Sequence, residues 1–287
     1  MSLLPPPSTS APAARQPQAH PALRALLDRH PRWFVLTGAG CSTDSGIPDY
    51  RDGQGQWKRT PPVTYQAFVG QHATRQRYWA RSLIGWRRFG SAQPNATHYA
   101  LAALQRQGRQ QALLTQNVDG LHQAAGSSEV IDLHGRLDQV RCLQCEHRLP
   151  RAQLQLMLVE RNPQWAKLDA ADAPDGDADL EAQDFSDFHI PACPQCQGML
   201  KPDVVFFGEN VPRARVELAG EQLEQADAML VVGSSLMVYS GYRFALAAAR
   251  AGKPIVAINL GHTRADALLS LKIEQPCAEA LSFLLTP

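Results

Sequence analysis

The chain has 287 residues, of which 44% are hydrophobic, and its formal net charge at pH 7 is +1. This length suits one large domain, or a large domain with a small insert, around a sizeable core. A near-neutral charge gives no overall attraction to nucleic acid or to an anionic membrane, so we expect neither as a partner. No apolar run reaches the roughly 18–20 residues that a transmembrane helix needs.

The first 23 residues are rich in Pro, Ala and Ser, a composition that predicts a disordered tail. A mitochondrial presequence is one interpretation, but the prolines would break the amphipathic helix that such signals use. No apolar secretory core follows Met1. We therefore expect a cytoplasmic location, with the mitochondrial matrix as the alternative. We also expect a monomer.

Short apolar runs that favour β-strands alternate with helical patterns along most of the chain. The expected strands cover residues 32–38, 112–117, 228–234 and 254–260, and the clearest helical stretches cover 95–108 and 240–252. This alternation predicts an α/β fold with a doubly wound parallel sheet of the Rossmann type.

The alternation stops in two places, which suggests inserts. We assign 24–49, 96–140 and 202–287 to the Rossmann-like domain. The helical insert 50–95 and a zinc module, 141–201, would form a smaller domain. Within that module the acidic stretch 169–188 is either a solvated loop or a lid near a substrate channel.

Four of the six cysteines form two Cys-x-x-Cys pairs, which comprise Cys142 with Cys145 and Cys193 with Cys196. Four thiolates with this spacing can close a tetrahedral site around one Zn²⁺. Because four protein ligands leave no open coordination position, we expect the zinc to be structural.

Polar and glycine residues follow the first two expected strands. Gly38 and Gly40 would let backbone N–H groups approach a pyrophosphate, although Thr43 occupies the third glycine position of the dinucleotide pattern. An ordinary strand-to-helix turn is the alternative. Asn117 and Asp119 would bind an amide or ribose hydroxyls, or Asp119 would simply cap the next helix.

Two further segments are ambiguous when each is taken alone. His134 is either a structural histidine or a catalytic one, and Gly135 behind it permits close approach of a ligand. The apolar run that ends residues 201–209 is either a core strand or an edge to which an extended peptide adds.

Taken in order, seven segments resemble motifs of the sirtuin family. They are GAGCSTDSGIPDYR (38–51), TQNVDGLH (115–122), LHG (133–135), the cysteine pairs, KPDVVFFGE (201–209), VVGSS (231–235) and INLG (258–261). The resemblance covers about residues 25–285, and segments 77–86 and 233–244 are similar to the class II branch. It implies a Rossmann-like domain and a smaller zinc domain, between which NAD meets an acylated lysine of a protein substrate.

The resemblance also implies roles for individual residues. Cofactor contacts are implied for Gly38, Ala39, Gly40, Ser42, Asp49, Tyr50, Arg51, Trp57, Gln116, Asn117, Asp119, Gly233, Ser234, Ser235, Asn259, Leu260, Gly261 and Cys277. Substrate contacts are implied for Val205, Phe206, Phe207, Gly208 and Glu209. His134, Asn117 and Asp119 are implied to be catalytic.

His134 would act as the general base. Its neutral imidazole would take a proton from a ribose hydroxyl, which then attacks the imidate formed between the acyl group and the ribose. The products would be nicotinamide, free lysine and O-acyl-ADP-ribose. The sequence thus predicts an NAD-dependent protein-lysine deacylase of the deacetylase type. The alternatives are a protein mono-ADP-ribosyltransferase, a deacylase for longer or acidic acyl groups, and a non-catalytic sensor.

Two segments depart from the family pattern. Many sirtuins have a Pro-Ala pair where this chain has Val238-Tyr239-Ser240-Gly241. Tyr78 and Arg81 resemble a pair with which class III members select acidic acyl groups. Arg81 would either bind an acyl carboxylate or be solvated on a helix in which Tyr78 packs.

Overall fold

The computed structural model describes residues 20–49, 62–169, 172–173, 177–178, 180 and 183–285. The predicted tail up to residue 19, the predicted cofactor contacts Tyr50, Arg51 and Trp57, and parts of the acidic stretch lie outside the described residues. The predicted tail is too long, because helix α1 spans Pro21–Arg29 and its Leu23 and Leu27 are buried in the core. Proline suits the first turn of a helix, where an N–H would have no intrahelical partner.

Six parallel strands form the large sheet in the spatial order β11-β10-β9-β1-β2-β3. They are β1 (Trp33–Thr37), β2 (Gln110–Thr115), β3 (Val130–Asp132), β9 (Ala228–Val232), β10 (Ile255–Ile258) and β11 (Leu271–Ile273). The chain runs outward from β1 through β2 and β3, and later outward on the other side through β9, β10 and β11. This reversal confirms the predicted doubly wound sheet and places its topological switch point between β1 and β9.

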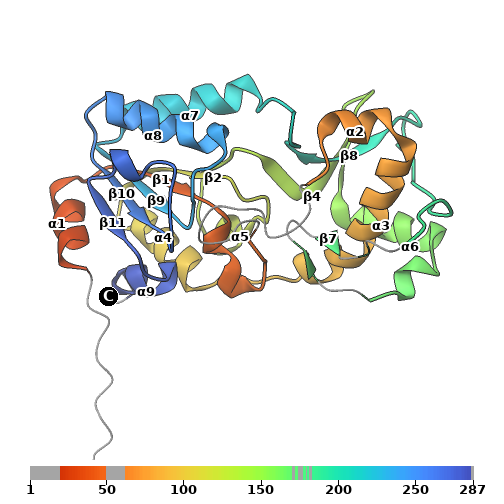
Figure 1. Ribbon diagram of the computed structural model, residues 1–287, viewed down its shortest axis with the longest axis horizontal. Helices are drawn as coiled ribbons and strands as arrows, with labels where there is room; N and C mark the ends of the chain where they lie inside the picture. Colours follow the sequence, from red (N-terminus) through yellow and green to blue (C-terminus); the bar gives the residue numbers. More distant parts are fainter. Residues whose placement is uncertain are drawn as a thin grey trace, which may run out of the picture.

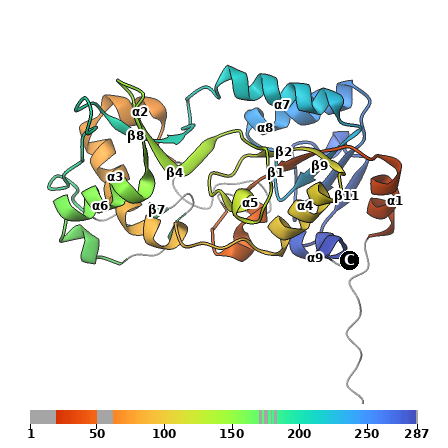
Figure 2. The same cartoon turned by 180° about the vertical axis from the view of Figure 1, so that it is seen from behind.

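Helices cover both faces of this sheet (Figures 1 and 2). The helices α1, α4 (Ala96–Arg106) and α9 (Cys277–Leu281) contribute to one apolar cluster, and α7 (Arg213–Gln225) and α8 (Tyr239–Arg250) contribute to the other. Alternate residues of β1 supply both clusters, since Val35 belongs to the first and Phe34 and Leu36 to the second. A strand that is buried on both faces has a continuous apolar sequence.

The smaller part contains an antiparallel sheet of three strands, in the order β5-β4-β8. Its elements are α2 (Tyr65–Gly70), α3 (His72–Phe89), β4 (Gly135–Cys142), β5 (Arg148–Pro150), α6 (Arg151–Arg161) and β8 (Leu200–Val204). A third apolar cluster holds the helices on the sheet, with Trp79 and Leu154 among its buried residues. Figure 1 shows this part beside the carboxyl ends of the large-sheet strands.

Short elements complete the described chain. They are η1 (Ala39–Cys41), η2 (Thr43–Ser45), α5 (Leu121–Ala124), η3 (Trp165–Lys167), β6 (Asp172–Ala173), β7 (Asp177–Ala178), η5 (Asp266–Leu268) and η6 (Ser282–Leu285). Within the described residues, every helix is too short or too polar to traverse a bilayer. The assigned boundary between residues 140 and 141 stays a prediction, although β4 pairs with the small sheet on both sides of it.

Candidate active site and metal centre

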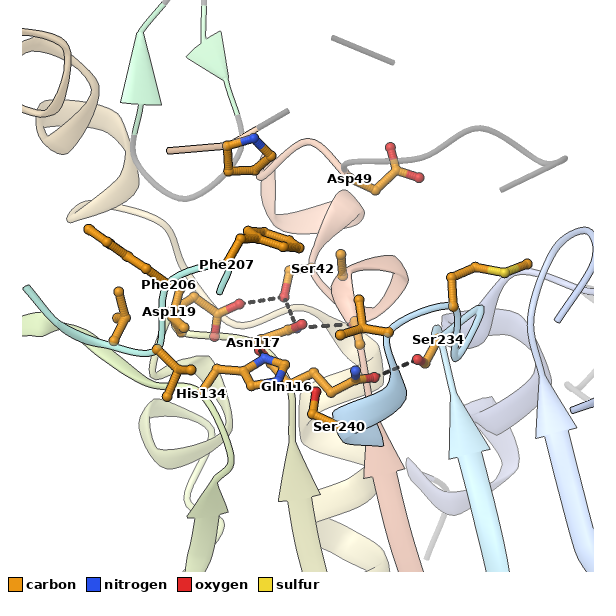
Figure 3. Close-up of a pocket in the computed structure, with 18 of the residues that line it drawn as sticks. Ser42, Asp49, Gln116, Asn117, Asp119, His134, Phe206, Phe207, Ser234 and Ser240 are labelled. Atoms are coloured by element: carbon orange, nitrogen blue, oxygen red, sulfur yellow. Dashed lines mark hydrogen bonds between the residues drawn. The ribbon is translucent and has the colours of Figure 1, made fainter. Parts of the chain in front are cut away.

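A cleft of about 690 Å³ is lined by residues from both parts of the molecule. It lies at the carboxyl ends of β1, β2 and β9, where open α/β sheets bind their ligands. The predicted site residues that line it are Gly38, Ala39, Gly40, Ser42, Asp49, Gln116, Asn117, Asp119, His134, Val205, Phe206, Phe207, Gly208, Glu209, Gly233, Ser234, Ser235, Asn259 and Leu260. Figure 3 shows the polar members converging from several strands.

Two predicted cofactor contacts, Gly261 and Cys277, do not line the cleft. Gly261 follows Leu260 and has a positive φ of 83°. Cys277 begins α9 and is buried, and its thiol lies 3.8 Å from the carbonyl oxygen of Ile258. The structure therefore brings most of the predicted contacts together and leaves these two outside the cavity wall.

The glycines after β1 have a role that the sequence did not reveal. The N–H groups of Gly38 and Gly40 donate to the carbonyls of Val232 and Gly233, at 3.1 and 2.8 Å. A Cβ on Gly40 would lie 2.9 Å from the Cα of Gly233, and one on Gly233 would lie 2.4 Å from the backbone nitrogen of Cys41. The glycines thus let the loops after β1 and β9 pack backbone against backbone at the switch point.

A hydrogen-bonded network joins the loops after β1 and β2. Ser42 donates to Asp119 at 2.7 Å, while the Asn117 amide donates to Ser42 at 3.0 Å and to the Gly38 carbonyl at 3.1 Å. Asp119 also accepts from the backbone N–H of Leu121 at 2.9 Å. Asp119 precedes Gly120, the N-cap of the short helix α5, and accepts from the first N–H of that helix, and it also lines the cleft where a ligand contact is predicted.

His134 is held from both ring nitrogens. Its Nδ1 lies 2.9 Å from the backbone oxygen of Gln116, and its Nε2 lies 2.8 Å from Oγ of Ser240. Burial lowers the pKa of His134, although the bond to Gln116 opposes the shift. The side chain of Gln116 is itself fixed, because Ser234 donates to it at 2.6 Å.

The segment after β8 forms one wall of the cleft and is anchored by its own ion pair. The ammonium group of Lys201, which is fully buried, lies 2.9 Å from the Glu209 carboxylate and 4.4 Å from the centre of the Phe206 ring. Glu209 also accepts from the backbone N–H of Phe206 at 2.9 Å. The Glu209 carboxylate is therefore bound to Lys201 and to the backbone of its own segment. Val205, Phe206 and Phe207 offer apolar surface to the cleft.

The structure confirms the packing of Tyr78 and corrects the expectation of a solvated Arg81. Tyr78 packs edge-on against Phe68 and Trp79, with ring centroids 5.3 and 5.2 Å apart. Arg81 is not solvated, because its side chain is only 13% exposed and its Nε lies 2.8 Å from the Asp177 carboxylate. Both residues of this ion pair line the cleft.

Sequence reasoning missed several residues that line the cleft or, like the buried Lys201, support its wall. Asp177 was hidden in an acidic stretch without periodicity, and Lys201 was one residue of a strand-like motif. Ser240 was noticed only as part of a departure from the family pattern. The signal in each case was weak, since no local pattern shows which distant side chain a residue will meet.

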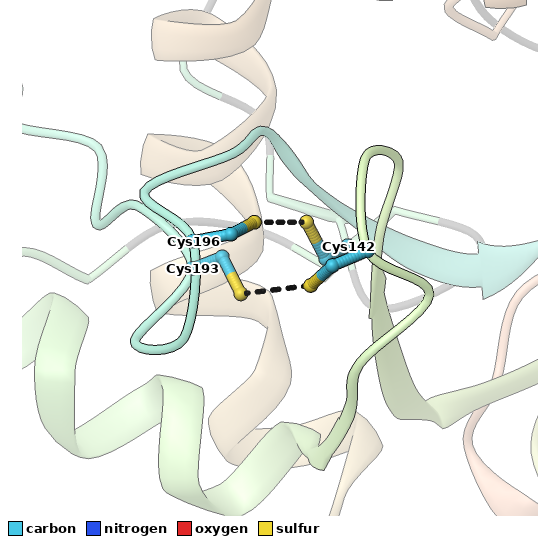
Figure 4. Close-up of side chains that lie close together, drawn as sticks. Cys142, Cys193 and Cys196 are labelled. Atoms are coloured by element: carbon cyan, nitrogen blue, oxygen red, sulfur yellow. Dashed lines mark hydrogen bonds between the residues drawn. The ribbon is translucent and has the colours of Figure 1, made fainter.

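The four cysteines of the two pairs meet at one end of the small sheet (Figure 4). Their sulfur atoms all lie within 4.8 Å of one another, with 3.4 Å between Cys142 and Cys196 and 3.8 Å between Cys145 and Cys193. A tetrahedral zinc with Zn–S bonds of about 2.3 Å requires sulfur separations of about 3.8 Å. The cluster therefore fits one four-coordinate Zn²⁺, as the sequence predicts.

Known proteins with similar sequences and structures carry the same architecture. Residues 38–240 match the model of the Sir2 family. An NAD-dependent protein deacetylase of Xanthomonas campestris pv. campestris is 69% identical over 270 residues, which cover 94% of this chain and 92% of that protein. One from Bordetella bronchiseptica is 66% identical over 261 residues, which cover 91% and 95% of the two chains.

Two solved structures extend the comparison. The one entitled "Sir2-p53 peptide-NAD+" has a TM-score of 0.76 and 30% identity, with 93% of this chain and 98% of that chain covered. The one entitled "Sir2 bound to acetylated peptide" has a TM-score of 0.73 and 29% identity, with 92% and 96% covered. On the family match, the sequence identity and the shared fold together, this chain belongs to the Sir2 family, the sirtuins.

Proposed function

We propose that the chain is an NAD-dependent protein-lysine deacetylase that transfers the acyl group to ADP-ribose and releases nicotinamide. One observation carries the proposal: the imidazole of His134 is buried in the cleft at the carboxyl ends of the strands, with Nδ1 bonded to a carbonyl oxygen. The relatives named as NAD-dependent protein deacetylases, and the Sir2 structures with NAD⁺ and acetylated peptide, support the same activity.

The residues present fit NAD. The close-packed loops after β1 and β9 form a turn that a pyrophosphate can approach, and Ser42, Asn117 and Asp119 offer polar atoms to ribose or an amide. Asn259 and Leu260 extend this wall beyond β10. When bound, NAD supplies the ribose hydroxyls and the acceptor of the acyl group. The four cysteines do not line the cleft, and the zinc that they would hold has a structural role.

His134 is suited to the base in this reaction. A carbonyl oxygen can only accept, so the Gln116 carbonyl requires a hydrogen on Nδ1 of the neutral ring and leaves a lone pair on Nε2. Because burial lowers its pKa below 6.5, the ring is neutral at pH 7 and can receive a proton. Activity should therefore fall only as the pH drops through this lowered pKa.

The acyl group that we propose is uncharged, with acetyl as the simplest case. Arg81 is one of the arginines that line the cleft and could attract an acidic acyl group, and Asp177 already pairs with it. A carboxylate that enters the cleft would have to compete with this ion pair. The Arg81–Asp177 contact therefore favours the deacetylase over the alternative that prefers acidic acyl groups.

The decisive experiment measures nicotinamide release with and without an acetylated peptide. For the wild type we expect release that depends on the peptide. His134→Ala should lower the rate of lysine product by about 10²–10⁴-fold, the usual contribution of a general base, with an unchanged circular-dichroism spectrum. His72→Ala, which removes an exposed imidazole at the start of α3, is the matched control and should keep full activity. Normal deacetylation by His134→Ala would refute the assigned role.

A further inference from the structure

Ser240 is the hydrogen-bond partner of the imidazole that the proposed function uses as its base. It is the second residue of α8, and its Oγ lies 2.8 Å from Nε2 of His134. In the part of the chain that the structure describes, this is its one side-chain hydrogen bond. It belongs to the segment Val238-Tyr239-Ser240-Gly241 and lines the cleft.

The packing of α8 explains how the hydroxyl reaches the ring. A Cβ on Gly241 would lie 2.6 Å from Nε2 of the Gln116 side chain, so a larger residue would press on that side chain. Glycine lets the first turn of α8 approach the loop after β2. Gln116 is the same residue whose carbonyl accepts the bond from Nδ1 of His134. The close contact between Gly241 and Gln116 therefore places the two hydrogen-bond partners of the imidazole, Gln116 and Ser240, next to each other.

The chemistry of these two partners differs. The Gln116 carbonyl can only accept, so Nδ1 keeps its hydrogen in both protonation states. The Ser240 hydroxyl can donate to the bare Nε2 of the neutral ring and, after rotation about its C–O bond, accept from the protonated one. The ring can consequently gain and lose a proton at Nε2 without moving and without leaving that atom unpaired.

The two states of this hydrogen bond are not equally strong. A hydrogen bond from a charged donor is roughly twice as strong as one between neutral groups. The Ser240 hydroxyl therefore stabilises the imidazolium more than the neutral ring. The amino end of α8 carries a partial positive charge that disfavours the imidazolium, as burial does, so an acceptor at this place opposes both effects.

We infer that Ser240 relays the proton to the base of this enzyme: its hydroxyl, which lines the cleft, takes the ribose proton while its own hydrogen passes to Nε2 of His134, whose new N–H it then accepts. The ribose O–H bond breaks as a new bond to Oγ of Ser240 forms, the original Oγ–H bond breaks as the Nε2–H bond forms, and the electron pair of the ribose O–H bond stays on the ribose oxygen. The inference rests on the proposed function for the identity of the base, but the hydrogen bond itself can be tested without turnover.

Other charged groups on the surrounding elements must be considered in any titration. They are Asp119 after β2, Asp132 on β3, Arg136 on β4, Arg215 on α7 and Arg243 on α8. Arg215 acts on the ring only through its charge, which lowers the pKa of His134. Since these groups are the same in every variant below, differences between variants report on the hydroxyl.

The experiment is an NMR titration of the His134 ring in the full chain, with His134→Ala used to assign its signal among the nine histidines. Ser240→Ala should lower the pKa of His134 by about 0.5–1 unit, whereas Ser240→Thr should restore it to near the wild-type value. Ser282→Ala, which removes the exposed hydroxyl of the C-terminal turn, is the matched control and should leave the titration unchanged.

Kinetics supply the second measurement. For Ser240→Ala we expect the acid limb of kcat to move to lower pH and kcat at pH 8 to fall by about 3- to 10-fold, with the KM values for NAD and peptide unchanged. An unchanged or raised pKa of His134 in Ser240→Ala would overturn the inference. Normal activity of His134→Ala would instead refute the proposed base while the titration still reported whether Ser240 bonds to the ring.

Discussion

The buried Lys201–Glu209 ion pair yields the most quantitative prediction. The change is Glu209→Gln, which keeps the shape of the side chain and removes its charge. Lys201 is fully buried, and its ammonium group lies 2.9 Å from the Glu209 carboxylate. Removing one partner of a buried pair typically costs about 3–5 kcal/mol, because the remaining charge is left in a poorly solvating interior.

The free energy of unfolding that Glu209→Gln can lose has a ceiling, because Lys201 can release its proton instead of staying charged. Neutralising a lysine with the ordinary pKa of 10.5 at pH 7 requires about 4.8 kcal/mol, at about 1.36 kcal/mol for each pH unit. Burial already lowers the pKa of Lys201, and Glu209 opposes that shift, so the variant should move the pKa further down. At pH 9 the ceiling falls to about 2.0 kcal/mol. The destabilisation should therefore lie between about 3 kcal/mol and the ceiling of about 4.8 kcal/mol at pH 7, and be at most about 2 kcal/mol at pH 9.

Urea unfolding at the two pH values, with equal slopes checked in each variant, measures this difference. Glu217→Gln is the matched control, because the Arg213–Glu217 pair on α7 is exposed and such pairs contribute less than about 1 kcal/mol. In turnover we expect the KM for acetylated peptide to rise, because Val205 and Phe206 lose their anchor, and the KM for NAD to stay constant. A loss below about 1 kcal/mol at pH 7, or one that grows with pH, would refute the reasoning.

Three further predictions concern the zinc, the acyl group and acid stability. Chelating the zinc, or replacing Cys145 by Ser, should raise amide exchange throughout the small sheet while β1 and β9 stay protected; unchanged exchange would contradict a structural zinc. Asp177→Asn should free Arg81 and raise kcat/KM for succinyl-lysine by about tenfold relative to acetyl-lysine, and an equal ratio in both proteins would argue against the ion pair as a selector. Burial lowers the pKa of His122 from 6.5 to about 3, so the unfolded chain binds this proton first as the pH falls. Stability should then drop by about 1.4 kcal/mol per pH unit below pH 6.5, and calorimetry of His122→Gln should show a smaller slope.

The regular elements of the large sheet were predictable because their causes are local. All five residues of β1 are buried, and a strand covered by helices on both faces must be apolar throughout. The zinc site was equally predictable, because the spacing of its cysteine ligands is a property of the chain itself. The start of α1 was misjudged, because only the burial of Leu23 against the sheet distinguishes that helix from the proline-rich tail.

The residues around the base were less predictable. Family resemblance identifies His134 as the base, whereas the residues next to it in the sequence fit a structural histidine equally well. Its role as the base is a prediction that His134→Ala tests. No local sequence pattern predicts the partner of Ser240 or of Asp177, because both partners are remote in the sequence. His134 lies 106 positions from Ser240, and Arg81 lies 96 positions from Asp177.

By itself the sequence determined the alternation of strands and helices, the four thiolates and membership of the Sir2 family, because each depends on composition or spacing within short segments. Only the tertiary structure decided that Gly40 packs on Gly233, that Ser240 meets the imidazole and that Asp177 neutralises Arg81. The physical reason is that hydrogen bonds and ion pairs act over a few ångströms in space. The distances that decide them are set by how the whole sheet brings remote loops together.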